Sequence, residues 1–386
     1  MMPRKLLILS IAALVAITAG VWLASRGSSG GADGQRVLYP QLKGQLDSIE
    51  SVRIYKAGDQ RAVELRREDS RWKVVERAGY PADEAKLGRL VRAIADAKLF
   101  EEKTANPENY PALGVEEVSD AAASGVRVEI AGVQPPIDLI VGKAGPAGQS
   151  RYVRRVQEAQ SWLVDADIDA SASPAAWLRK DIVDVSADRM QSATVSLTGK
   201  KPYTAAKDSR TAVNFVIANL PKGKKLTYES APNTFATALA SLTLNDVEPA
   251  GEFEGKKPQA QATYTTFDGL VVQLDGWSNN EQRYIAVKTS FDPQIAERFA
   301  LPTAAADDAD DAEGADTNGE DASNAAKAAA DQQDGAADGD ARADHAGESN
   351  AAEEAAKANE RLAGWVFEIP SYKYDQIFKP LEELIE

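Results

Sequence analysis

An uninterrupted apolar run extends from Leu6 to Ala24, and nothing comparable occurs in the rest of the chain. A helix of that length rises about 1.5 Å per residue and therefore spans the hydrocarbon layer of about 30 Å once. Arg4 and Lys5 precede the run and only Arg26 follows it closely, so the positive-inside rule predicts a short cytoplasmic N-terminus. The sequence thus predicts a single-pass protein of the bacterial inner membrane whose C-terminal bulk lies in the periplasm.

A cleaved signal peptide is the alternative interpretation of the same run. The run is longer than a usual signal-peptide core, Val21, Trp22 and Leu23 stand near its end, and a small-x-small site is only weakly present around residues 18–20. These features favour an uncleaved anchor. The chain contains no cysteine, which excludes a lipoprotein-type attachment, disulfides and thiolate chemistry.

The net charge of −15 is concentrated in one segment. Residues 303–358 hold 16 acidic and three basic residues, a net charge of −13, so the rest of the chain is nearly neutral. We therefore expect neither a nucleic-acid surface nor a polybasic membrane patch. The segment has no aromatic or large aliphatic residue, which predicts a disordered insertion with a frayed helix near residues 350–363. It also holds the only histidine, His345, which removes Ser-His-Asp catalysis and histidine-ligated zinc from the folded part.

Residues 47–186 show short alternating runs around one helix. Alternation of apolar and polar residues predicts strands at 49–54, 61–66 and 71–75. Asp83 is suited to cap a helix in which Leu87, Leu90, Val91 and Ile94 follow at the spacing of one buried face. Further strands are predicted at 126–130, 137–141, 152–156 and 162–164, and a short helix at 174–178.

The same succession recurs, diverged, after residue 187. Strands are predicted at 190–195, 213–217, 261–264, 270–274, 283–285 and 365–367. A second amphipathic helix is predicted because Phe235, Ala238, Leu239 and Leu242 repeat the earlier spacing. The individual matches are weak, but their order over a long stretch indicates an internal duplication.

These patterns predict an α+β fold: two diverged copies of a mainly antiparallel sheet with one amphipathic helix, after a single N-terminal transmembrane helix. The expected organisation is a cytoplasmic N-terminus (1–5), the transmembrane helix (6–24), a linker (25–46), the first copy (47–186), the first part of the second copy (187–302), the acidic insertion (303–358), and the last strand and C-terminal helix of the second copy (359–386). No glycine-rich phosphate-binding or nucleophile-elbow motif is present, so no nucleotide cofactor is expected. The acidic segment could bind cations, but it lacks the Asp-x-Asp-x-Asp-Gly spacing with a distal Glu of a calcium loop, and the chain has no cysteine and one histidine, so no metal is expected.

Several motifs together resemble the bacterial family called domain of unknown function 4340. They are the N-terminal anchor, Ile49-Glu-Ser-Val-Arg-Ile54, the strand with Trp72, Pro81-Ala-Asp83, Tyr110-Pro-Ala-Leu-Gly114, Gly142, Arg151-Tyr152-Val153 and Trp162-Leu163-Val164. The resemblance covers residues 47–185 well and the second copy more loosely. Members of that family are often encoded beside gliding-motility-type ABC transporter components, so the resemblance implies an accessory role there and supplies no catalytic residues.

Three sets of side chains are candidates for a site, each with a structural explanation that we prefer. Asp83, Glu101 and Glu102 could form a paired-carboxylate glycosidase site, but a helix cap and a solvated helix end explain them. The other two sets are an arginine cluster for an anionic glycan or lipid headgroup, which ion pairing on a strand explains, and a tryptophan platform for sugars, which core packing explains. The arginine cluster comprises Arg151, Tyr152, Arg154 and Arg155, and the tryptophan set comprises Trp72, Trp162, Trp177 and Trp365.

Three functions of different classes follow from these features. The preferred one is a non-catalytic, membrane-anchored periplasmic accessory or scaffold protein, associated with the membrane subunits of an ABC transporter. The alternatives are a periplasmic protein that binds glycan, lipid or peptide, and a carboxylate-dependent envelope hydrolase. A ligand-binding protein would show an apolar or aromatic concavity, and a hydrolase would show converging carboxylates with perturbed pKa values.

Overall fold

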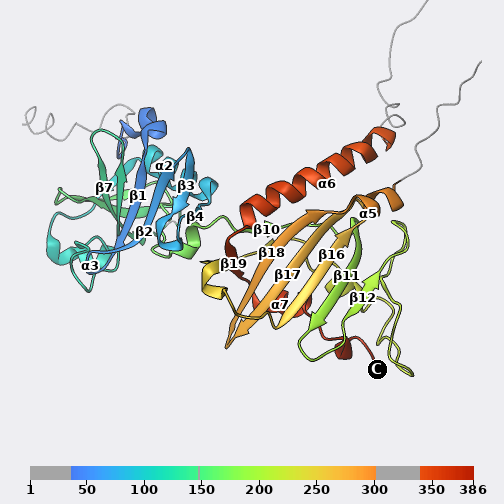
Figure 1. The fold of residues 1–386 in the computed structure, drawn as a ribbon. Coiled ribbons are helices and arrows are strands. Elements are labelled where there is room, and N and C mark those ends of the chain that lie inside the picture. Colours follow the sequence, from blue (N-terminus) through green and yellow to red (C-terminus); the bar gives the residue numbers. More distant parts are fainter. Residues whose placement is uncertain (1–35, 147, 301–339) are drawn as a thin grey trace, which may run out of the picture. The chain divides into compact units, whose positions relative to one another are not determined.

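The computed structural model of the protein describes residues 36–146, 148–300 and 340–386 (Figure 1). The predicted anchor, residues 6–24, lies outside them, and within them no helix has the length and apolar character needed to cross a membrane. The described chain divides into two compact units. The first unit holds the residues up to Trp72 and Glu84–Ser173, and the second holds Lys73–Asp83 and Pro174–Glu386.

The first sheet has the strand order β4-β3-β2-β1-β6-β7-β8-β9-β5. Strands with defined register pair antiparallel along it, as between β1 and its neighbours β2 and β6. The strands are β1 (Ser51–Lys56), β2 (Gln60–Glu68), β3 (Arg71–Val74), β4 (Tyr80–Pro81), β5 (Leu99–Glu102), β6 (Val126–Ala131), β7 (Ile137–Ala144), β8 (Arg151–Arg155) and β9 (Ser161–Val164).

One face of this sheet carries the core of the first unit. Val52, Ile54, Val63, Leu65 and Val128 alternate along β1, β2 and β6 and are completely buried, as the period of two predicts. Helix α2 (Glu84–Asp96) begins directly after Asp83 and buries the four residues that the helical spacing singles out. The prediction of this helix and of the strands in residues 47–164 is confirmed in position.

The second sheet has the order β13-β12-β11-β16-β17-β18-β19-β15, again with antiparallel neighbours. A separate pair joins β10 (Asp181–Val183) and β14 (Leu242–Thr243). The strands of the main sheet are β11 (Met190–Leu197), β12 (Tyr203–Ala206), β13 (Val216–Ile217), β15 (Asp246–Pro249), β16 (Ala260–Thr266), β17 (Leu270–Asn279), β18 (Gln282–Phe291) and β19 (Trp365–Glu368).

Eight strands of the first sheet have a counterpart in the second at the same place in the order. The order in the first sheet is β3-β2-β1-β6-β7-β8-β9-β5, and the matching order in the second sheet is β13-β12-β11-β16-β17-β18-β19-β15. The mostly antiparallel sheets with several helices make the chain an α+β protein, as predicted.

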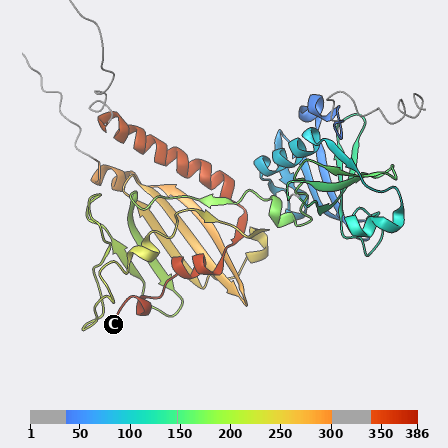
Figure 2. The ribbon, with the colours of Figure 1, turned by 180° about the vertical axis from the view of Figure 1, so that it is seen from behind.

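The core of the second unit lies between its sheet and short helices, α4 (Asn233–Ala236) and α7 (Ser371–Ile377), on one face (Figure 2). The fully buried Tyr264 hydroxyl donates to the carbonyl oxygens of Phe235 at 3.0 Å and Ile377 at 3.4 Å. On β17, Gly276 admits the Phe378 ring, because a Cβ at this position would lie 2.6 Å from it.

The second predicted amphipathic helix does not form, although its four apolar residues do belong to the core. Phe235, Ala238, Leu239 and Leu242 are all buried, but only one helical turn forms before strand β14. The Thr237 hydroxyl donates to the carbonyl of Asn233 at 2.7 Å. Hydrogen bonds of this kind, from a Thr or Ser side chain to the backbone, compete with helix formation. The segment contains several Thr and Ser residues.

The helix expected near residues 350–363 is present, but it is longer and packed rather than frayed. Helix α6 (Asp340–Leu362) includes residues 340–358 of the insertion that was predicted to be disordered, with His345 among them. Ala351, Ala355 and Leu362 are buried against the sheet, and the Thr289 hydroxyl on β18 donates to the Ala355 carbonyl at 2.7 Å. The alanine methyls are small enough for the helix to approach closely, so packing there needs no large aliphatic side chain.

Candidate functional site

The three candidate carboxylates lie on different elements, Asp83 before α2 and Glu101 and Glu102 on β5. Asp83 precedes α2, and its main-chain N–H donates to the Trp177 carbonyl at 2.7 Å. Glu101 and Glu102 lie on edge strand β5 rather than at a helix end, because pairing with β9 draws the chain into the sheet soon after α2 ends. The Glu101 carboxylate lies 2.7 Å from the Lys103 ammonium and is half exposed, which is the arrangement of a surface ion pair.

The arginine cluster on β8 is engaged in local contacts. Arg154 is 3% exposed and donates to the Val115 carbonyl at 2.9 Å and to the Glu117 carboxylate at 2.6 Å. Its guanidinium also lies over the Tyr110 ring. Arg151 pairs with Asp167 and Arg155 with Glu158, while Tyr152 packs against the small core of Tyr110, Val115 and Ile140. These contacts fix the loop before β6 on the sheet and agree with the structural explanation.

The four tryptophans differ in how far their side chains are buried. Trp177 is completely buried. Trp72, Trp162 and Trp365 are partly buried, and Trp365 contacts the Tyr80 ring edge-on with centroids 5.1 Å apart. Trp162 and Trp365 lie on the corresponding strands β9 and β19. None of these contacts makes a stacking platform for a sugar.

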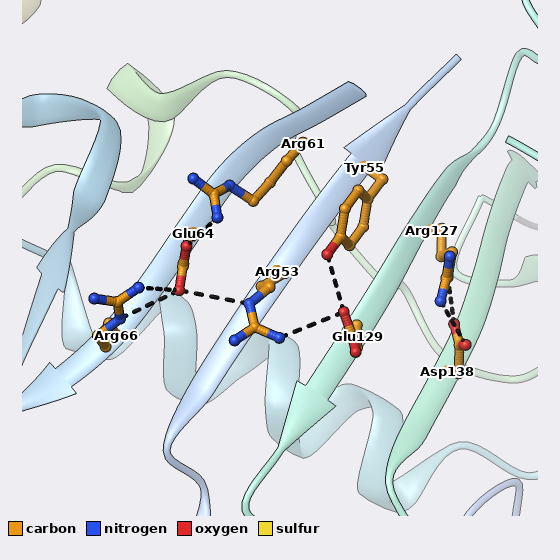
Figure 3. Close-up of polar contacts among 8 residues, drawn as sticks. All are labelled: Arg53, Tyr55, Arg61, Glu64, Arg66, Arg127, Glu129 and Asp138. Atoms are coloured by element: carbon orange, nitrogen blue, oxygen red, sulfur yellow. Dashed lines mark hydrogen bonds and ion pairs between the residues drawn. The ribbon is translucent and has the colours of Figure 1, made fainter. Parts of the chain in front are cut away.

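The structure instead brings charged side chains together on the outer face of the first sheet (Figure 3). They come from four neighbouring strands, β2, β1, β6 and β7, and α2 lies behind the sheet in this view. We call this set the charged face. Its members are Arg53, Tyr55, Arg61, Glu64, Arg66, Arg127, Glu129 and Asp138.

A β-bulge places Arg61 beside Glu64. Residues three apart on a regular strand point to opposite faces, but the register shifts here, so that Ile54 pairs with Val63 and Tyr55 with Arg61. Arg61 Nη1 thereby lies 2.6 Å from Glu64 Oε2. The extra residue in β2 turns one more guanidinium onto the charged face.

Glu64 is at the centre of three arginines. Arg66 Nη2 lies 2.7 Å and Arg53 Nε 3.5 Å from Glu64 Oε1, in addition to the contact with Arg61. The Glu64 side chain is 1% exposed because the guanidinium groups cover it. Burial acts to raise the pKa of Glu64, but the hydrogen bond and the charges of the three arginines outweigh it and hold the pKa below its usual value.

The contacts continue across the sheet to β7. Arg53 Nη1 lies 3.6 Å from Glu129 Oε2, which accepts a hydrogen bond from the Tyr55 hydroxyl at 3.0 Å. Arg127 donates two hydrogen bonds to Asp138, at 2.7 and 2.8 Å, and its guanidinium lies over the Tyr55 ring. Burial and the neighbouring Glu129 raise the pKa of Tyr55, and the hydrogen bond to Asp138 raises that of Arg127.

This geometry suits binding better than proton transfer. A general acid at neutral pH needs a raised carboxyl pKa, and that of Glu64 is lowered. Arg61 and Arg66 are about half exposed, at 46% and 48% of the side chain, while their contacts with Glu64 hold them in place. Ordered arginines and tyrosines on an exposed surface are typical of protein interfaces.

The sequence carries a signal for the charged face in the spacing of its charged residues and tyrosines. Three pairs of residues stand two positions apart on strands that alternation predicts. They are Arg53 and Tyr55, Glu64 and Arg66, and Arg127 and Glu129. Such pairs share one face of a strand. Which strands are neighbours, and therefore which pairs meet, came only from the fold.

Within the part of the chain that the structure describes, no group of three or more His, Asp or Glu side chains is placed to hold a metal ion. The features above define an α+β protein with two large, mainly antiparallel sheets, one of which presents an ion-paired outer face. Residues 72–266 match the family model described as Domain of unknown function (DUF4340), and the chain belongs to this family. No curated protein and no solved structure matches the chain.

Proposed function

We propose that the protein is a membrane-anchored periplasmic accessory or scaffold protein without catalytic activity, associated with the membrane subunits of an ABC transporter. The apolar run Leu6–Ala24 supports the anchor and the orientation. The resemblance to family members encoded beside transporter components supports the association. The charged face is the surface through which we expect the first unit to contact its partner.

One observation carries this proposal: the fold does not require the charged face. We further propose that the two units arose by duplication, because eight strands keep the same order in both sheets. On the second sheet, the face opposite α4 and α7 carries mainly uncharged polar side chains where the first carries arginines and carboxylates. They include Thr194, Thr204, Gln261, Thr263 and Gln273, and the charged residues among them, Asp275 and Lys288, form no described ion pair. A sheet of this order therefore forms without the ion-paired network, which points to a role in recognition.

Co-purification from the membrane in mild detergent tests the proposal. Arg61→Glu with Arg66→Glu should weaken recovery of the membrane partner at least several-fold, because reversed charges at an interface repel the complementary surface. The matched control is Arg92→Glu, on the exposed side of α2. Equal recovery with the double variant and the control would contradict the docking role.

The anchor is tested separately. Exchanging residues 6–24 for an unrelated apolar span should weaken co-purification, and reporter fusions after Gly34 and at the C-terminus should be active only with a reporter that functions outside the cytoplasm. Activity of a cytoplasmic reporter, or release of the chain from washed membranes, would defeat the predicted topology. Loss of cellular function in Glu101→Gln with the fold preserved would favour the hydrolase alternative.

A further inference from the structure

The outer face of the second sheet, opposite α4 and α7, contains a hollow of about 360 Å³. Figure 1 shows this face, on which β11, β16, β17 and β18 lie side by side. Side chains from these four strands line the hollow. The volume falls in the range of about 300–1,000 Å³ that is usual for small-molecule sites.

Hydroxyl, amide and carboxylate side chains form two rows across β11, β16 and β17. The strand register sets the members of each row directly opposite one another, and side chains two residues apart on a strand share a face. The intervening residues Ala262 and Leu274 are buried in the core, so both rows point away from it. The first row is Thr194, Thr263 and Gln273, and the second row is Ser196, Gln261 and Asp275.

Two hydrogen bonds order these rows without using up their polar groups. The Thr194 hydroxyl shares a hydrogen bond of 2.8 Å with the Thr204 hydroxyl on β12. Gln261 Nε2 donates to Asp275 Oδ1 at 2.7 Å. An amide has two N–H donors and a carbonyl acceptor, and a carboxylate has a second oxygen, so both side chains keep donors or acceptors for a ligand. The exposed Gln273 amide adds a further donor and acceptor.

The chemistry of the lining favours an uncharged ligand. Its charged residues are Asp275 and, on β18, Lys288, one of each sign. A nucleic acid or an anionic lipid surface attracts clusters of basic residues, and one lysine near a carboxylate does not provide a cluster. Protein interfaces are enriched in arginine and aromatic residues, whereas hydroxyl and amide groups dominate here. Such groups are complementary to the hydroxyl groups of a sugar.

An aromatic group borders the hollow on the same face. Trp277 stands two residues beyond the second row on β17 and opposite Tyr284 on β18. The Phe253 ring of the short helix η5 (Ala250–Phe253) packs against both, with centroids 5.2 and 5.1 Å away. The indole N–H donates to the Lys256 carbonyl at 3.2 Å, which holds the ring in place. Trp277 is partly exposed and so offers a rigid apolar surface to the C–H face of a sugar.

We propose that this outer face of the second sheet binds an uncharged oligosaccharide. The amides of Gln261 and Gln273 hydrogen-bond the sugar hydroxyl groups, and one sugar ring packs on Trp277. Neighbouring strands lie about 4.8 Å apart, so the lining extends about 14 Å from β11 to β18, which suits a chain of several sugars. The site does not depend on the scaffold function, since its residues all belong to the second unit and the charged face to the first.

Calorimetric titration of the full chain in lipid nanodiscs tests the proposal, with empty nanodiscs as the blank. Nanodiscs replace maltoside detergents here because those detergents carry sugar headgroups. The probes are three uncharged hexasaccharides, chitohexaose, cellohexaose and maltohexaose, and the anionic hexagalacturonate. At least one uncharged probe should bind in a saturable way and more tightly than hexagalacturonate.

Two variants place the ligand on this face. Gln273→Ala should weaken binding of that probe about fivefold, the loss expected for one hydrogen bond. Because the side chain is exposed, the fold should persist, which the melting temperature checks. The matched control Gln294→Ala, exposed on α5 (Pro293–Arg298), should bind as the unchanged chain does. Tryptophan emission should change on binding, and Trp277→Phe should remove that change.

Several results would overturn the proposal. Absence of binding by all three uncharged probes, or tighter binding of hexagalacturonate than of each of them, would exclude an uncharged oligosaccharide. Equal binding by Gln273→Ala and the unchanged chain would place the ligand elsewhere, as would tryptophan emission that stays constant at saturation or still changes in Trp277→Phe. None of these measurements involves a membrane partner, so their failure is distinct from failure of the scaffold proposal.

Discussion

Glu64→Gln tests whether the arginines of the charged face are held by a single carboxylate. The substitution keeps the size of the side chain and an oxygen acceptor but removes the charge that faces Arg61 and Arg66 at 2.6 and 2.7 Å and Arg53 at 3.5 Å. An ion pair with a half-exposed arginine contributes up to about 1 kcal/mol, so the two close contacts and the weaker third amount to about 2 kcal/mol. We expect the first unit to lose that much free energy of unfolding at pH 7.

Peptide-resolved hydrogen exchange on the full chain in mild detergent measures this loss. A loss of about 2 kcal/mol corresponds to exchange about 30-fold faster in globally protected amides of β1 and β2, while peptides from β16 and β17 serve as the internal reference. The control is Glu129→Gln, whose carboxylate is 30% exposed and has one arginine at 3.6 Å. We expect a loss below about 0.5 kcal/mol there.

The pH dependence follows from the lowered pKa of Glu64. A group whose pKa is lower in the folded state stabilises it fully above the unfolded pKa of about 4.3, and this contribution is lost as the pH falls through the folded pKa. The exchange ratio between Glu64→Gln and the unchanged chain should therefore be largest at pH 7 and should shrink toward one in acid. A ratio near one at pH 7, or a ratio equal to that of Glu129→Gln, would refute the reasoning.

Three further substitutions test the packing. Leu90→Asp on the buried stripe of α2 should unfold the first unit, since an unpaired buried charge costs several kcal/mol, and the lost exchange protection would show it. Ala355→Leu should destabilise the contact of α6 with the sheet by about 1–3 kcal/mol, whereas exposed Ala356→Leu should not; equal melting temperatures would contradict this. Gly142→Ala should lower the melting temperature, because its Cβ would meet the Leu113 carbonyl oxygen at 2.4 Å; an unchanged melting temperature would show that the loop moves freely.

Local periodicity was sufficient to predict most strands and one helix. Alternation along residues 49–54 and 61–66 identified β1 and β2, and the spacing of Leu87 to Ile94 identified α2, because these patterns record which side of an element meets the core. The same reasoning failed at Phe235 to Leu242. There the four apolar residues are buried by a single turn and a strand, and periodicity cannot tell a buried helix from another compact path.

The sequence by itself determined the apolar N-terminal run, the α+β class, the family resemblance and the core stripe of α2, since each depends on residues close together in the chain. Only the tertiary structure decided the candidate sites. A register shift set Arg61 beside Glu64, and the packing of small alanines brought α6 to the sheet and its Arg361 to the carbonyl oxygens of Asp181 and Ile182. These neighbours are far apart in sequence or face each other through a local irregularity, and contacts of that kind depend on strand order, register and helix packing, which no short sequence pattern encodes.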